Sequence, residues 1–198
     1  MNNVEGITLL TRAHAYLSEV VAAVPEEAWG FPAPCSHWTV RQVLNHARLD
    51  QQAYGAAITG VGRPGSDPFQ PADLLDADAQ AVLDKVLRDV ADAYAPLPAD
   101  AEEVATPLGP LPLRIAAAAG AMDAAVHAWD IAVATGQDVP LDEELAEGIW
   151  VAAERLVDHL RNSFGVFAPA REVTEDYSRA DSLLAFLGRD PRWTPAVS

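Results

Sequence analysis

The chain has 198 residues and half of them are hydrophobic, a size and composition typical of one domain with a well-packed core. Its net charge of −16 and its 13 scattered Lys and Arg residues argue against binding to nucleic acid or to an anionic membrane, because both need clustered positive charge. There is no apolar run of membrane-spanning length and no signal-peptide pattern, and the one cysteine, Cys35, cannot form an internal disulfide. These features predict a single domain over residues 1–198 in a reducing cytoplasm.

The first part of the chain predicts two helices separated by a Pro-rich loop. Apolar residues at helical spacing predict the first helix over 4–24. Thr39 followed three residues later by Gln42 has the form of a capping box, which marks the start of a second helix. This helix should run to about residue 59, where Gly60 is placed to end it.

Four further helices are predicted after the Pro- and Gly-rich loop at 61–72. Apolar periodicity predicts a third helix over 76–95. The segment 113–135 is apolar on nearly every face, so this fourth helix should lie buried at the centre of the fold. A fifth helix is predicted over 141–161 and a short sixth over 178–187. The predicted fold is all-α: a four-helix bundle with one or two additional C-terminal helices.

The buried fourth helix carries ionisable residues that a buried helix should avoid, because an unpaired buried charge is costly. Asp123, His127 and Asp130 fall within roughly 60° of one another around the helix axis. An Asp and a His four residues apart can reach the same metal ion. The stripe is therefore a candidate for metal ligands.

The second helix offers a counterpart in His46, which shares a face with Gln42 and Asp50. Bundle metal sites are built where polar residues of facing helices meet in the interior. Two imidazoles and one carboxylate, with a position left for water, suit catalytic zinc and also iron or nickel. Because structural zinc sites use four protein ligands and usually cysteine, an open site is favoured here.

Other interpretations of these residues stay open at this point. His127 and Asp130 can form a polar pair that ties two helices together, and Asp50 can be a solvated residue. His14 and His159 lack a carboxylate cluster and are interpreted as core or surface residues. His37, in the loop beside Trp38, can cover the site or serve as a packing residue. Cys35, Trp38 and Trp129 are interpreted as buried packing residues.

Three segments resemble a known family. PCSHWTVRQVLNHA (34–47), VHAWDIAVATGQ (126–137) and LLAFLGRDPRW (183–193) resemble an actinobacterial family of small metal-binding proteins. That family is related to the N-terminal domain of mycothiol-dependent maleylpyruvate isomerase and, more distantly, to the DinB-like bundles. The resemblance spans nearly the whole chain and implies a DinB-like four-helix bundle with a divalent metal, commonly zinc, at one end.

The resemblance also implies a ligand set. In the isomerase, a His on the second helix and a carboxylate-x-x-x-His pair on a later helix hold the metal, which correspond here to His46, Asp123 and His127. The family pattern has Glu where this chain has the shorter Asp123. Asp130 is therefore an alternative, either as a direct ligand or as an acceptor that orients an imidazole.

The implied function is less specific than the implied fold. The isomerase has a further C-terminal domain that contributes to its active site, and this length leaves no room for one, so the isomerase activity is not carried over. The leading hypothesis is a metal-dependent thiol transferase or isomerase that uses a low-molecular-weight thiol such as mycothiol on a small electrophile. The alternatives are a non-catalytic metal- or ligand-binding module and a metal-free hydrolase using Cys35. DinB-like bundles often pair, which leaves a homodimer open.

Overall fold

A computed structural model describes residues 1–35 and 38–195 of the chain, and this part is almost entirely helical. Apart from two isolated bridges, Pro32 with Thr39 and Val104 with Leu111, it has no β-structure. No helix in the same residues is both long enough and apolar enough to cross a lipid bilayer. The elements are α1 (Asn3–Ala22), the 3-10 helix η1 (Glu26–Gly30), α2 (Val40–Thr59), α3 (Ala79–Tyr94), α4 (Leu113–Ala134), α5 (Glu143–Phe164) and α6 (Arg179–Phe186).

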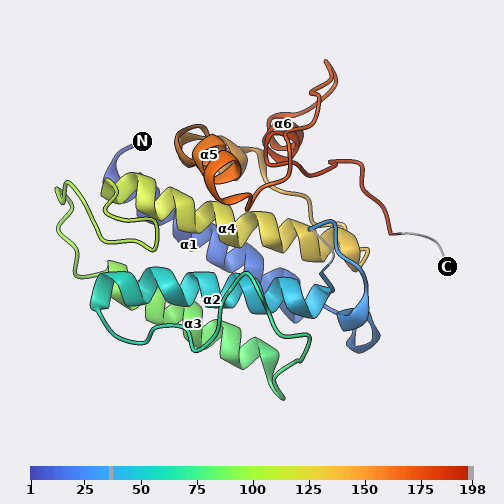
Figure 1. The fold of residues 1–198 in the computed structure, drawn as a ribbon, viewed down its shortest axis with the longest axis horizontal. Helices are drawn as coiled ribbons and strands as arrows, with labels where there is room; N and C mark the ends of the chain where they lie inside the picture. Colours follow the sequence, from blue (N-terminus) through green and yellow to red (C-terminus); the bar gives the residue numbers. More distant parts are fainter. Residues whose placement is uncertain (36–37, 196–198) are drawn as a thin grey trace.

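The first four α-helices form the predicted bundle. α4 packs against α1 and α2, and α3 covers the other side of these two helices (Figure 1). α5 lies against α4 and α1, and α6 packs on α5. The prediction of an all-α bundle with additional C-terminal helices is confirmed.

Local signals set most helix boundaries. The Thr39 side chain accepts a hydrogen bond from the backbone N–H of Gln42, and the Gln42 side chain accepts one from the backbone N–H of Thr39, so α2 begins with the predicted capping box. α2 ends at Gly60, whose φ of 79° lies in the left-handed region that favours glycine. α3 begins three residues later than predicted, because the Asp78 side chain caps its first turn. The 3-10 helix η1 was not predicted.

α4 is the central helix, as its composition predicted. Neighbouring helices cover it on several sides, and nearly all of its residues are buried. Its many alanines allow close approach: a Cβ added at Gly6 of α1 would lie 3.1 Å from the Arg114 Cα of α4. Small residues on both helices let the two backbones pack tightly, so any polar side chain on α4 must find its partner inside the bundle.

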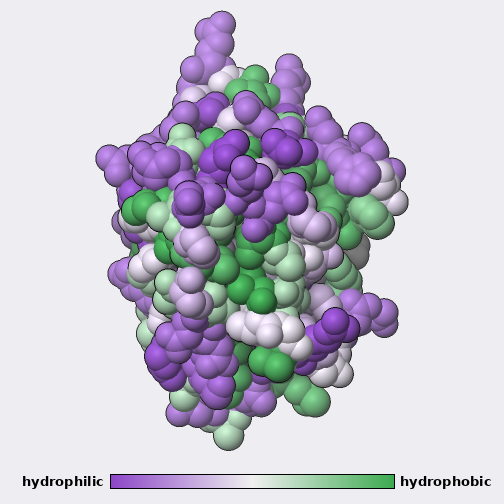
Figure 2. All heavy atoms as spheres, turned by 90° about the vertical axis from the view of Figure 1, so that its left-hand side faces the viewer, coloured by the Kyte–Doolittle hydropathy of each residue, from purple (hydrophilic) through white to green (hydrophobic). Residues whose placement is uncertain are grey.

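The surface is mixed in character. Figure 2 views the molecule from the left-hand side of Figure 1, and hydrophilic residues cover much of this face with hydrophobic residues between them. Large apolar side chains such as Val61 and Leu74 are exposed singly in loops. Such isolated exposure is ordinary for soluble domains. The interior of the bundle, and not its outer surface, therefore holds the unusual chemistry.

Candidate metal centre

Three of the predicted ligands meet where α2 faces α4. The Nε2 atom of His46 lies 3.7 Å from Oδ1 of Asp123, and the Nε2 atom of His127 lies 3.6 Å from the same oxygen. The two imidazole rings are 4.7 Å apart and nearly perpendicular. One donor atom from each residue falls within 4.8 Å of the others. Helical spacing aligns the two α4 residues, and the packing of α2 on α4 supplies the third.

The outer nitrogen of each imidazole is fixed by an acceptor. Nδ1 of His46 lies 2.8 Å from the carbonyl oxygen of Pro68, and Nδ1 of His127 lies 2.9 Å from Oδ2 of Asp130. A carbonyl or an ionised carboxylate can only accept, so each Nδ1 must carry the proton. Burial lowers the pKa of His127 to about 4, which keeps this ring neutral near neutral pH. Both Nε2 atoms therefore present lone pairs toward the carboxylate of Asp123.

Asp123 divides its two oxygens between different partners. Oδ1 faces the imidazoles, whereas Oδ2 accepts a 2.8 Å hydrogen bond from Nε2 of Gln51. The carboxyl also hydrogen-bonds to that of Asp50. Burial, and then the charge of Asp50, raises the pKa of Asp123 well above its usual range. Asp50 therefore belongs to the cluster and is not the merely solvated residue that sequence reasoning allowed.

Asp130 lies behind His127 and is fully buried. Arg189, from the turn after α6, places Nη2 3.1 Å from Oδ2 of Asp130 and Nε 3.4 Å from Oδ1. Burial works against ionisation of Asp130, but the charge of Arg189 and the bond to His127 outweigh it and lower the pKa of this carboxyl. Asp130 is thus an ionised acceptor that orients His127.

A second group of potential ligands, Cys35, His127 and Asp130, also lies close together. Cys35 is buried, as predicted, and Nη2 of Arg189 lies 3.4 Å from its Sγ atom. Because the guanidinium already places a positive charge between the thiol and Asp130, a second cation there would be repelled. The geometry therefore favours the group that contains His46.

Aromatic side chains flank the outer side of His46. The rings of Trp38 and Phe69 lie 4.9 Å and 5.6 Å from the His46 ring. Phe69 is 52% exposed, so its ring lies between the cluster and solvent. His37, which the sequence placed beside Trp38 as a residue able to cover the site, lies outside the described residues.

The loop between α2 and α3 is held against α2 by polar side chains. Nδ2 of Asn45, which is buried, donates to the carbonyl oxygens of Ala72 and Leu74 at 2.8 Å and 2.7 Å. The same loop carries the Pro68 carbonyl that receives Nδ1–H of His46. The orientation of His46 thus depends on a loop that Asn45 helps to fix.

An Asn45→Ala variant should therefore loosen this loop and lower stability by about 1–3 kcal/mol, because two buried carbonyls lose their donor. Amide hydrogen exchange should accelerate at residues 68–75, and urea unfolding should show the loss of stability. Gln52→Ala is the matched control, since Gln52 donates to Gly62 on the exposed part of the same loop. Unchanged exchange in the Asn45 variant would contradict the assigned role.

The remaining histidines and tryptophans agree with their predicted packing roles. His14 is buried, and its Nε2 lies 2.8 Å from Oε1 of Gln51, whereas His159 is exposed on α5. Trp129 is buried, and Trp38 is half-buried. Sequence reasoning missed Gln51 and Arg189. Arg189 lies in the segment 183–193 that carried the family resemblance, whereas a single glutamine on a helix gave no signal.

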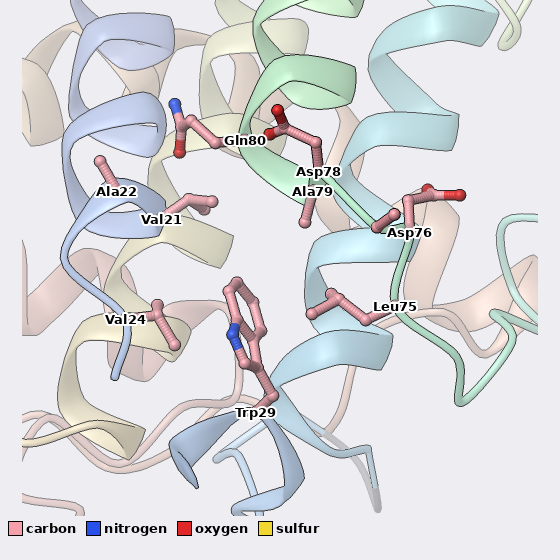
Figure 3. A pocket seen from close by; sticks show the side chains of 10 residues that line it. Val21, Ala22, Val24, Trp29, Leu75, Asp76, Asp78, Ala79 and Gln80 are labelled. Carbon is pink, nitrogen blue, oxygen red and sulfur yellow. The ribbon is translucent and has the colours of Figure 1, made fainter. Parts of the chain in front are cut away.

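The larger cavities lie elsewhere. One of about 340 Å³ is formed by the end of α1, η1 and the start of α3, and Figure 3 shows the Trp29 ring forming its lower part. Apolar side chains such as Val21, Val24 and Leu75 form much of its wall, with Asp76 and Asp78 beside them. None of the residues that line it belongs to the polar cluster, which is instead closely packed inside the bundle.

Comparison with known proteins agrees with this architecture. The family model described as the mycothiol maleylpyruvate isomerase N-terminal domain matches residues 10–132. Uncharacterized proteins from two strains of Mycobacterium tuberculosis are 31% identical over 182 residues, which cover 91% of this chain and 96% of theirs. Crystal structures of the mycothiol-dependent maleylpyruvate isomerase and of a variant match with TM-scores of 0.56 and 0.60 at 18% and 17% identity, over 77% of this chain and 68% of theirs. These structures share the fold, and the chain belongs to the mycothiol maleylpyruvate isomerase N-terminal domain family.

Proposed function

We propose that this protein binds a divalent metal ion, with zinc expected, through His46, Asp123 and His127, and uses it with the thiol mycothiol in a transferase or isomerase reaction. One observation carries the metal proposal. Two buried imidazoles, each with Nδ1 fixed by an acceptor, present their Nε2 lone pairs to the same carboxylate oxygen. Converging lone pairs of this kind are stabilised by a cation.

The residues present fit zinc in chemistry and spacing. Zinc bonds of about 2.0–2.1 Å place tetrahedral ligands roughly 3.3 Å apart. The separations of 3.6 Å and 3.7 Å between Nε2 and Oδ1 need only a small contraction to reach that value. Three protein ligands leave a coordination position open, as in catalytic zinc sites, and the same set accepts iron or nickel.

Asp130 is assigned to orienting His127 and not to direct ligation. Its Oδ2 atom already accepts Nδ1–H of His127 and a guanidinium N–H of Arg189. Carboxylates that hold a ligating histidine in this way fix the tautomer and raise the basicity of the ligand. Of the two carboxylates that the sequence left as alternatives, Asp123 is the proposed ligand.

The thiol part of the proposal rests on family membership and on the surroundings of the site. A bound divalent metal would supply the positive charge that holds a thiol as its reactive thiolate near neutral pH. The ligating residues would keep a position open for that sulfur, and Trp38 and Phe69 would shield it from water. The family model is named for a mycothiol-dependent isomerase, which favours mycothiol as the thiol.

The test is a calorimetric titration of mycothiol into the protein loaded with zinc and into the same protein stripped by a chelator. We expect binding with proton release by the zinc-loaded form only, because the thiol must ionise to bind. Glutathione serves as the control thiol. Equal binding with and without zinc, or none in either case, would contradict the proposed function.

A further inference from the structure

A buried polar side chain behind the candidate metal centre has not been assigned a role so far. Gln51 of α2 is fully buried, in a bundle interior made mostly of apolar residues. Its Nε2 donates to the carbonyl oxygen of Gly120 at 2.9 Å and to Oδ2 of Asp123 at 2.8 Å. Its Oε1 lies 2.8 Å from Nε2 of His14 on α1. One amide thus connects three helices of the bundle.

The partners of Gln51 leave its amide only one favourable orientation. Both N–H groups of the amide are directed at oxygen atoms, a backbone carbonyl and a carboxylate, that accept hydrogen bonds. A flipped amide would place its oxygen against these acceptors. The Oε1 atom must accept, so His14 donates its Nε2–H to it. Burial lowers the pKa of His14, so the ring is neutral and keeps a single N–H for this bond.

We infer that Gln51, anchored by His14, is a positioning residue that holds the Asp123 carboxylate so that Oδ1 faces the two ligating imidazoles. The two carboxylate oxygens have separate tasks, since Gln51 engages Oδ2 while Oδ1 faces His46 and His127. This inference rests on the proposed metal-binding function and extends it by two residues outside the ligand set.

The chemistry of an amide suits this task. The Gln51 side chain is neutral, so it does not compete with a metal ion for Asp123 and adds no charge to the buried cluster. Its N–H group stabilises the ionised carboxylate and so offsets part of the rise in the Asp123 pKa caused by burial and by Asp50. Without it, the carboxylate could rotate about its last bond and lose its ligating orientation.

The test measures the affinity for zinc ion alone, by competition with a chromophoric chelator. Gln51→Leu and His14→Phe keep approximate size and remove the hydrogen bonds, and each is expected to weaken zinc binding roughly 10- to 100-fold. His14→Gln restores a donor at a similar reach and should recover most of the affinity. The matched controls are Gln52→Leu, on the exposed side of α2, and His159→Phe, on α5, and both should bind as the wild type does.

A structural role for Gln51 is separated from a positioning role by the cobalt(II)-substituted protein. A changed carboxylate orientation should alter the visible spectrum of bound cobalt, whereas general destabilisation should not. If Gln51→Leu fails to fold, the pair of His14 variants decides the question. Wild-type affinity in His14→Phe would overturn the inference alone, and absence of zinc binding by the wild type would overturn both this inference and the proposed function.

Discussion

A His127→Ala variant, purified without a histidine tag, should contain only background metal, whereas the wild-type protein should contain nearly stoichiometric zinc. His127 is buried on the central helix, and its Nε2 atom is one of the two imidazole donors near Asp123. Loss of an orienting partner costs roughly 10- to 100-fold in metal affinity, and loss of a ligand removes the bond itself, so the expected loss exceeds about 100-fold. Elemental mass spectrometry of the purified proteins measures this directly.

His46→Ala should lose metal to the same degree, because it removes the donor from the other helix. His159→Ala is the control, since this histidine is exposed on α5 and should leave the metal content unchanged. Zinc retained by both His46→Ala and His127→Ala would rule out the assigned ligand set. If the wild-type protein binds no metal even after incubation with zinc, the cluster is a buried hydrogen-bonded network, and the non-catalytic hypothesis then becomes the leading one.

Arg189→Ala is expected to lower the free energy of unfolding by about 3–5 kcal/mol, because it leaves the charge of Asp130 buried and uncompensated. For a chain of this length, each kcal/mol shifts the melting temperature by roughly 2–4 °C, so calorimetry should show a fall on the order of 10 °C. The same change removes the partner that keeps Asp130 ionised and bonded to His127. Zinc affinity should therefore also fall.

Two further variants identify the cause. Arg192→Ala breaks an ion pair with Asp176 in which both side chains are exposed, and it should cost less than about 1 kcal/mol. Adding Asp130→Asn to Arg189→Ala removes the uncompensated charge and should recover part of the lost stability. A melting temperature within the range of the Arg192 variant would show that the Asp130–Arg189 pair does not hold the C-terminal segment to the bundle.

The helices and the central position of α4 could be predicted because their signals are local. Thr39, Gln42 and Gly60 are close in sequence to the boundaries that they set, and backbone geometry determines how they act. Likewise, Asp123 and His127 lie four residues apart on one helix, so the helical repeat alone places them on one face. Their alignment needs no information about other helices.

Packing between helices determined the rest of the site. Whether His46 meets the α4 pair, and whether Gln51 reaches His14 and Asp123, depends on how α1 and α2 are rotated and shifted against α4. That register results from many apolar contacts and is not encoded near any one of these residues. Arg189 reaches Asp130 across 59 positions of the chain because α5 and α6 return the C-terminal segment to the bundle. The helical repeat fixes which residues share a face of one helix, whereas their partners on other helices are fixed only when the whole core packs.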